Sequence, residues 1–315
     1  MANRRVIRKS ALSLAIFSLL ATHPALALSS KPALKTEMLI STDWLAAHLS
    51  DANVVVLCIA SSEDFYSKGH IPGARQILLS DLVISRDGIP NELPETEKLK
   101  ALFEKAGVSN DSRVILYGER YGLLAARTYF TLDYMGLGAH TALLDGGLEK
   151  WHAEHRPEST KASDVKPGKL TLHLQPHLLT TLAAMRAYSS EAVEKKSATV
   201  ALLDARPEDE FSGSKISEDV PRAGHIPGAA SLFWLNAIVS KENPVLRPVE
   251  DLRGLFKAAG VAPDLKVVTY CRSGMQSSMD YFFAKYLGYD ASMYDASFYE
   301  WSRQDLPVVM EKKEK

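Results

Sequence analysis

The segment KLKALFEKAGVSNDSRVILYG, residues 98–118, returns 153 positions later as DLRGLFKAAGVAPDLKVVTYC, residues 251–271. Nine of the 21 aligned positions are identical, including Phe103/Phe256 and Tyr117/Tyr270. Each copy starts with apolar residues at helical spacing, reaches a glycine and then enters a short apolar stretch rich in β-branched residues. This order predicts a helix that ends at the glycine and is followed by a buried strand, once in each half of the chain.

Further repeats extend this duplication over most of the sequence. GHIPGA occurs at residues 69–74 and again at 224–229, and LLDGGLEKW, ending at Trp151, matches MYDASFYEW, ending at Trp301. The matches keep the same order in both halves, which indicates two copies of one unit. Short apolar runs alternate with amphipathic helical stretches, a pattern typical of a parallel sheet with helices on both faces. We therefore predict an α/β fold of two tandem domains, residues 36–155 and 178–312, joined by a polar, proline-containing linker at 156–177.

Residues 1–27 have the composition of a secretory signal peptide. Basic residues open the segment, ALSLAIFSLLA follows, and ALA at 25–27 suits signal peptidase. The apolar stretch is too short to span a bilayer. The opening RRVIRK weakly resembles a twin-arginine signal, but an ordinary secretory signal fits better. We expect a periplasmic or secreted protein with no membrane attachment after cleavage.

The composition is that of an ordinary soluble protein, with 46% hydrophobic and 24% charged residues among 315. Removing residues 1–27 takes four of the 37 basic residues and leaves 33 against 38 acidic ones, a net charge of −5. No basic patch suggests nucleic acid as a partner. No Cys/His cluster has metal-ligand spacing, and no GxGxxG or P-loop occurs, so neither a metal nor a cofactor is expected. We expect a monomer acting on small molecules.

Cys271 is one of only two cysteines, and it follows the apolar run KVVTY directly. Ligand sites in parallel sheets lie beyond the carboxyl ends of the strands. The residues after CRSGMQS have helical apolar spacing, so the cysteine precedes a helix N-terminus, where free backbone N–H groups favour an anion. That field and the neighbouring Arg272 favour the thiolate form. The pattern favours a nucleophilic cysteine over a buried structural one, the commoner role of a lone cysteine.

Two chemistries use a cysteine in such an anion-binding loop. A cysteine phosphatase needs an arginine six positions after the cysteine, and Ser277 stands there instead. Sulfur transfer has no such requirement, so the loop favours sulfur transfer.

On these motifs the chain resembles a two-domain rhodanese, a thiosulfate sulfurtransferase. The resemblance covers nearly all of the chain after residue 27 and rests on the repeated GHIPGA, on LLDARPEDEFSG at 202–213, on CRSGMQS and on YDASFYEW at 294–301. It implies two rhodanese-like domains of which only the second is catalytic. Gly118 occupies the position that matches Cys271, which agrees with a first domain that lacks the cysteine.

The resemblance implies a persulfide cycle at Cys271. The thiolate takes the outer sulfur of thiosulfate, sulfite leaves, and cyanide or a thiol removes the sulfur. The loop N–H groups and Arg272 are expected to hold the anionic end of the donor. The implied substrate-binding residues are those of the loop, namely Arg272, Ser273, Gly274, Met275, Gln276 and Ser277.

Two further arginines are candidates near the loop. Glu210 stands where some animal relatives have a substrate-binding arginine, so that contact is not transferred to this chain. Arg206 and Arg222 are the cations available nearby, and for Arg206 substrate binding and bracing of the loop both stay open. Asp204 and Arg222 are expected to support the cysteine loop.

The donor is the least determined part of this interpretation. Thiosulfate-using members tend to have a basic residue in the loop, whereas 3-mercaptopyruvate-specific members tend to have CGSG. The sequence CRSG is mixed, and Arg272 favours thiosulfate. A 3-mercaptopyruvate sulfurtransferase and a persulfide carrier that serves a partner protein remain alternatives.

Other conspicuous residues have structural interpretations. His70 and His225, in the two GHIPGA turns, are expected to tie backbone together, and Trp151 and Trp301 to pack in the core. Cys58 lies in a buried strand, and a disulfide between it and Cys271 is not expected.

Overall fold

The computed structural model describes residues 1–2, 31–194, 199–217 and 219–311, and the described residues from 31 onward belong to one unit. Apart from its first two residues, the predicted signal peptide lies outside the described residues. None of the described helices is long and apolar enough to cross a membrane.

The first half is built on a five-stranded parallel sheet in the order β1-β7-β6-β2-β3. Its strands are β1 (Leu39–Ile40), β2 (Val54–Ala60), β3 (Arg75–Leu78), β6 (Arg113–Gly118) and β7 (Thr141–Leu144). A separate antiparallel hairpin consists of β4 (Ile84–Arg86) and β5 (Ile89–Glu92). The helices are η1 (Thr36–Met38), α1 (Thr42–His48), α2 (Glu63–Ser67), α3 (Leu79–Leu82), α4 (Thr96–Lys105), α5 (Leu123–Tyr134), η2 (Gly138–His140) and α6 (Gly147–Ala153).

The second half repeats this plan with a four-stranded parallel sheet in the order β11-β10-β8-β9. The strands are β8 (Val200–Asp204), β9 (Ala229–Ser231), β10 (Lys266–Tyr270) and β11 (Ala291–Met293). A parallel bridge between Leu179 and Met293 stands where β1 pairs with β7 in the first half. The helices are η3 (Pro176–Leu178), α7 (Leu182–Glu194), α8 (Glu208–Phe211), η4 (Trp234–Ala237), α9 (Val249–Ala258), α10 (Ser277–Tyr286) and α11 (Ser297–Trp301).

Alternate residues of each strand face different helical layers, as expected of a sheet buried on both sides. In the first half, Leu57 belongs to the same buried cluster as α4 and α5, whereas Cys58 belongs to the cluster of α1 and α6. The predicted α/β fold, with parallel sheets between helical layers, is therefore confirmed.

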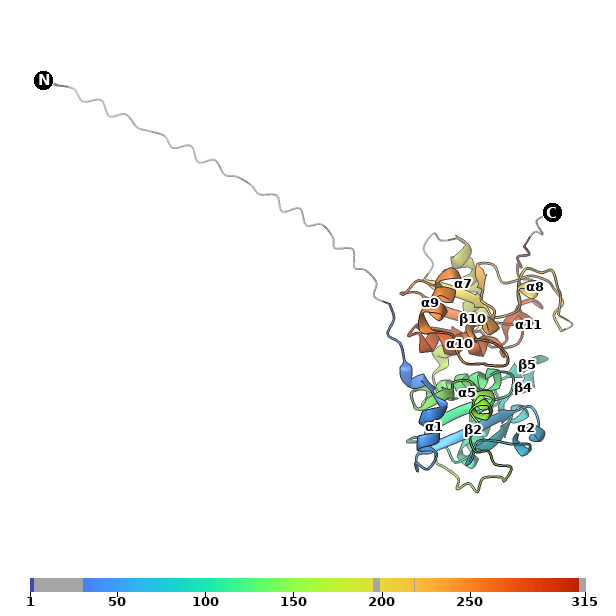
Figure 1. Cartoon of the computed structure of the whole chain (residues 1–315). Coiled ribbons are helices and arrows are strands. Elements are labelled where there is room, and N and C mark those ends of the chain that lie inside the picture. Colours follow the sequence, from blue (N-terminus) through green and yellow to red (C-terminus); the bar gives the residue numbers. More distant parts are fainter. Residues whose placement is uncertain (3–30, 195–198, 218, 312–315) are drawn as a thin grey trace. The chain divides into compact units, whose positions relative to one another are not determined.

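The two halves share one core because α5 packs against α10 (Figure 1). Aromatic rings meet edge to face across this contact. Tyr129 and Phe282 have centroids 5.0 Å apart, and Phe130 and Tyr281 have centroids 5.1 Å apart. The half with Cys271 therefore packs firmly against the half that lacks an equivalent cysteine.

The two GHIPGA turns are built alike. His70 Nδ1 contacts the Tyr66 carbonyl at 2.8 Å, and His225 Nδ1 contacts the Phe211 carbonyl at 2.9 Å. Each imidazole also stacks on the ring of the same residue, with centroids 3.6 and 3.8 Å apart. The histidines thus bind backbone, in keeping with the structural role expected for them.

Candidate active site

Cys271 directly follows the carboxyl end of β10, and the loop of residues 271–276 leads into α10. Its side chain is buried, with 1% exposure. Among the described residues, the backbone N–H groups of Arg272, Ser273, Met275 and Gln276 donate to no other protein atom. Unpaired donors at a helix N-terminus form an anion-binding cradle, which stabilises negative charge on a sulfur or its substrate.

Gly274 allows the loop to turn this tightly. Its φ is +79°, and a Cβ atom there would lie 2.2 Å from Oδ1 of Asp295. Both the left-handed backbone and the close approach exclude a larger residue at this position.

Ser297 supports the cradle from the start of α11. Its Oγ accepts hydrogen bonds from the backbone N–H groups of Cys271 and Gly274, each at 3.1 Å, and donates to the Tyr294 carbonyl at 2.8 Å. The same oxygen lies 4.0 Å from the sulfur of Cys271. Ser297 thus fixes the two ends of the CRSG turn beneath the nucleophile.

Arg127 extends from α5 of the first half into the base of the loop. Its fully buried guanidinium forms two hydrogen bonds with Asp295, at 2.5 and 3.0 Å, and also donates to the carbonyls of Gly274 and Asn91. The Asn91 amide donates to Ser273 Oγ at 2.9 Å. The first half therefore positions the cysteine loop through Arg127 and Asn91.

The Arg272 guanidinium is paired with a carboxylate. Its Nη2 lies 2.5 Å from Oε1 of Glu210, and its Nε lies 3.4 Å from Oε2. The predicted loop cation is therefore present, together with a counter-charge that the sequence interpretation did not assign to it.

Arg206 is buried, and its guanidinium is held through Nε and Nη2. It binds both carboxylate oxygens of Asp204 at 2.6 to 3.1 Å, donates to the Gly224 carbonyl and lies over the Phe298 ring. Burial alone lowers the pKa of Arg206, but the Asp204 carboxylate outweighs that effect and the pKa is raised. Of the two roles left open for Arg206, this geometry favours bracing over substrate binding.

Asp204 and Arg222 act at different distances from the loop. Asp204 ends β8 in register with Tyr270, the residue before the cysteine, and the Ala205 N–H donates to the Tyr270 carbonyl. Arg222 instead donates to four carbonyls from Trp301 to Leu306, at the end of α11 and just beyond it. Any support that Arg222 gives to the loop is transmitted through α11.

The remaining predicted loop residues lie around the cradle. Met275 is buried, Gln276 is the residue that precedes α10, and Ser277 opens the helix. The Ser277 carbonyl accepts from Oγ1 of Thr269, whereas its own buried Oγ has no partner among the described residues.

In the first half, the residue equivalent to Cys271 is Gly118, at the end of β6. A Cβ atom there would lie 2.3 Å from the Ile59 carbonyl oxygen, so no side chain fits where the second half has its cysteine. The other cysteine, Cys58, is fully buried in β2, and burial raises the pKa of its thiol to about 12. Both cysteines are free, and Cys271 alone occupies the cradle.

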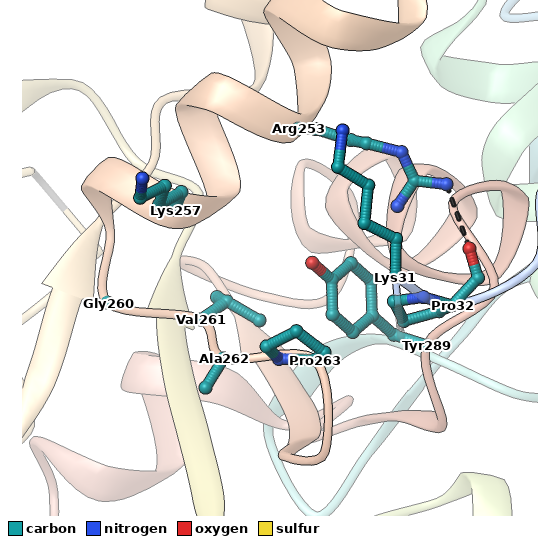
Figure 2. A pocket seen from close by; sticks show the side chains of 9 residues that line it. All are labelled: Lys31, Pro32, Arg253, Lys257, Gly260, Val261, Ala262, Pro263 and Tyr289. Carbon is teal, nitrogen blue, oxygen red and sulfur yellow. Dashed lines mark hydrogen bonds between the residues drawn. The ribbon is translucent and has the colours of Figure 1, made fainter. Parts of the chain in front are cut away.

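Two cavities differ in where they lie relative to the cysteine loop. One of about 420 Å³ borders Pro263, before the amino end of β10, and therefore lies at the opposite end of the strand from Cys271. Figure 2 shows Tyr289 and Val261 in its lining and Arg253 donating to the Pro32 carbonyl. The other, of about 300 Å³, is lined by Glu92 and Asp295 among others and adjoins the Arg127 contact.

Several of these residues carried no assigned role in the sequence interpretation. Asp295 and Ser297 lie in the repeated motif at 294–301, which marked the segment but not their function. Arg127 interrupts the apolar stretch LLAARTYFTL, and a lone charge in such a stretch is a signal of a buried ion pair. No feature of the sequence around Asn91 indicates its contact with the cysteine loop.

Comparisons with known proteins agree with the fold and the site. The model of the rhodanese-like domain matches residues 41–154 and 188–304. The chain is 34% identical to the sulfur carrier protein TtuD of Thermus thermophilus, over 84% of this chain and 93% of that protein. It is 32% identical to a thiosulfate sulfurtransferase of Azotobacter vinelandii, over 84% and 94% respectively.

Solved structures give the same result. SseA from Escherichia coli, described as a 3-mercaptopyruvate sulfotransferase, matches with a TM-score of 0.72 and 25% identity, over 82% of this chain and 97% of that one. These relatives support a sulfurtransferase activity and leave the donor open. The chain therefore belongs to the rhodanese-like family and contains two rhodanese-like domains, as its repeats predict.

Proposed function

We propose that the protein is a thiosulfate sulfurtransferase that carries sulfur as a persulfide on Cys271. The observation that supports this most directly is the position of Cys271 inside a cradle of unpaired N–H groups at the start of α10. Curated relatives named thiosulfate sulfurtransferases favour thiosulfate as the donor.

The cycle has two balanced steps. The Cys271 thiolate attacks the outer sulfur of thiosulfate, the sulfur–sulfur bond breaks, and sulfite leaves with the bonding electron pair. Cyanide or a thiolate then attacks the terminal sulfur of the persulfide and regenerates the Cys271 thiolate as thiocyanate or a new persulfide forms. The loop N–H groups stabilise the charged persulfide between the two steps.

Two related functions have support of their own. Use of 3-mercaptopyruvate is favoured by the Glu210 carboxylate, which offsets the charge of Arg272. Delivery of sulfur to a partner protein is favoured by the similarity to a relative named as a sulfur carrier.

Mass spectrometry tests the covalent step. Incubation with thiosulfate should add about 32 Da, one sulfur atom, to the peptide that contains Cys271. Cys271→Ser should abolish this addition and the transfer to cyanide. Cys58→Ser is the matched control and should retain most of the activity, since Cys58 is buried in β2 away from the cradle. Sulfur found on Cys58, or transfer by a folded Cys271→Ser protein, would refute the assignment.

A further inference from the structure

Glu210 is placed to govern the charge at the edge of the cysteine loop. It lies on α8 with a side chain only 3% exposed, whereas the Arg272 side chain that it holds is 36% exposed. The carboxylate therefore has a fixed position in the protein, and the pair keeps Arg272 bound at the edge of the loop.

The other charges near the loop are already paired, so the Glu210–Arg272 pair determines the net charge that an anionic donor meets there. Arg206 is already matched by Asp204, and Arg127 is matched by Asp295. Among the described residues, each arginine in contact with the cysteine loop or with Asp204 beside it thus has a carboxylate partner. The attraction for anions then comes mainly from the N–H dipoles of the loop, without the net positive charge that Arg272 alone would supply.

Donors differ in how strongly they depend on such a charge. Thiosulfate is a small dianion without a carbon skeleton, so its binding comes from N–H donors and positive charge. 3-Mercaptopyruvate has a single negative charge and a ketone that offers a further hydrogen-bond acceptor. Coulomb energy scales with the charge of the ligand. Neutralising Arg272 therefore reduces the binding free energy of the thiosulfate dianion about twice as much as that of the 3-mercaptopyruvate monoanion.

We infer that Glu210 is a specificity-determining residue: by pairing with Arg272 it reduces, without abolishing, the preference of the site for the thiosulfate dianion over donors with a single negative charge. This inference rests on the proposed persulfide chemistry at Cys271. It predicts that the rate of sulfur loading from thiosulfate follows the net charge of the 210/272 pair.

Four proteins test this charge dependence. Glu210→Gln keeps an oxygen acceptor for Arg272 and makes the pair net positive, so kcat/KM for thiosulfate should rise about tenfold. For 3-mercaptopyruvate, kcat/KM should rise only about threefold. Its charge is half that of thiosulfate, so the change in free energy is halved and the fold-change is the square root of about ten. Arg272→Gly should lower thiosulfate use below wild type, and Arg272→Gly with Glu210→Gln should restore most of that loss because the pair is neutral again.

Glu208→Gln is the matched control. Glu208 lies in the same turn of α8, but it binds Ser231 Oγ at 2.8 Å instead of Arg272, so both donors should be used as in wild type. Folding is checked by circular dichroism, and Glu210→Ala replaces Glu210→Gln if the latter does not fold.

The outcomes separate the two proposals. Equal changes for both donors, or a double variant as poor as Arg272→Gly, would overturn the role of Glu210 while the Cys271 persulfide still forms. Absence of the 32 Da addition with either donor in the wild-type protein would instead refute the persulfide mechanism itself.

Discussion

Ser297 shows how one residue can hold a reactive loop in place. It has a φ of +57°, a left-handed conformation that is unfavourable for a residue with a side chain, and it is fully buried. The strain places its Oγ where it accepts two N–H groups of the cysteine loop. Backbone strain of this kind persists where the surrounding structure enforces it, and here it lies directly beneath the nucleophile.

Ser297→Ala should therefore impair catalysis as well as stability. Two buried N–H groups would lose their acceptor, which costs about 1–3 kcal/mol for each unsatisfied group. We expect kcat/KM for sulfur transfer to fall about 10- to 100-fold, with a lower free energy of unfolding measured in urea.

Ser302→Ala is the control for this substitution, because Ser302 lies just beyond α11 and the one hydrogen bond of its Oγ within the described part of the chain goes to the Tyr299 carbonyl, at 3.3 Å. If the two variants lose the same stability and keep the same kcat/KM, Ser297 has no special role in positioning the loop.

At the scale of elements, the strand–loop–helix unit occurs twice, and only the second copy has space for a cysteine after the strand. In the second half, β10 ends at a loop with room for a cysteine; in the first half, β6 ends at Gly118, which pairs in register with Ile59. The Ile59 carbonyl occupies the space of a side chain at position 118. The backbone of the first half, as well as the missing thiol, therefore leaves no room for a cysteine at position 118.

Gly118→Cys should consequently fail to create a second site. We expect a loss of about 1–3 kcal/mol in the free energy of unfolding from overpacking. Thiosulfate should still load one sulfur per chain, as counted by mass spectrometry of the intact protein. Gly254→Ala in α9 is the control, since a Cβ there meets nothing within 4 Å, and it should leave stability unchanged or raised by about 0.5–1 kcal/mol. A second persulfide at position 118 would contradict this account.

At the scale of the whole molecule, the two halves meet around charged groups that are largely removed from water. Glu92, at the end of β5, lines the same cavity as Asp295. Burial, followed by the repulsion of Asp295, raises the pKa of Glu92 from 4.5 to about 7. The contact between the halves thus includes a carboxyl group that titrates near neutral pH.

Stability should therefore fall as pH rises through the range set by Glu92. Between about pH 4.5 and 7 the unfolded chain releases this proton before the folded protein does, which favours unfolding. Relative to Glu92→Gln, wild type should lose about 1–2 kcal/mol over this range, a value reduced for solvent screening of a half-buried group.

Urea unfolding at pH 4.5, 5.5, 6.5 and 7.5 measures the difference between the two proteins. Glu95→Gln is the control, because it removes a nearby carboxylate that is exposed beside Arg86. Parallel stability curves for wild type and Glu92→Gln would show that Glu92 has an ordinary pKa.

The sequence predicted the features that repeat or that depend on local order. The duplication, the parallel sheets and the position of Cys271 between strand and helix follow from periodicity and spacing. The partners of the loop do not, because Arg127, Asn91 and Asp295 meet only when segments over 160 positions apart in the chain pack together. Glu210 departs from the family pattern in the sequence, but its pairing with Arg272 follows only from the three-dimensional structure.

The buried pair of Arg127 and Asp295 also has an evolutionary consequence. Under the proposed mechanism the first half has Gly118 in place of the nucleophile, so chemistry at Cys271 alone would not require this half to be kept. A second copy on its own would leave the Asp295 carboxylate without its counter-charge and the α10 face open to water, a defect of several kcal/mol. Deletion of the first half would thus carry a cost in stability for the second, and an interface of this kind favours the inheritance of both halves together.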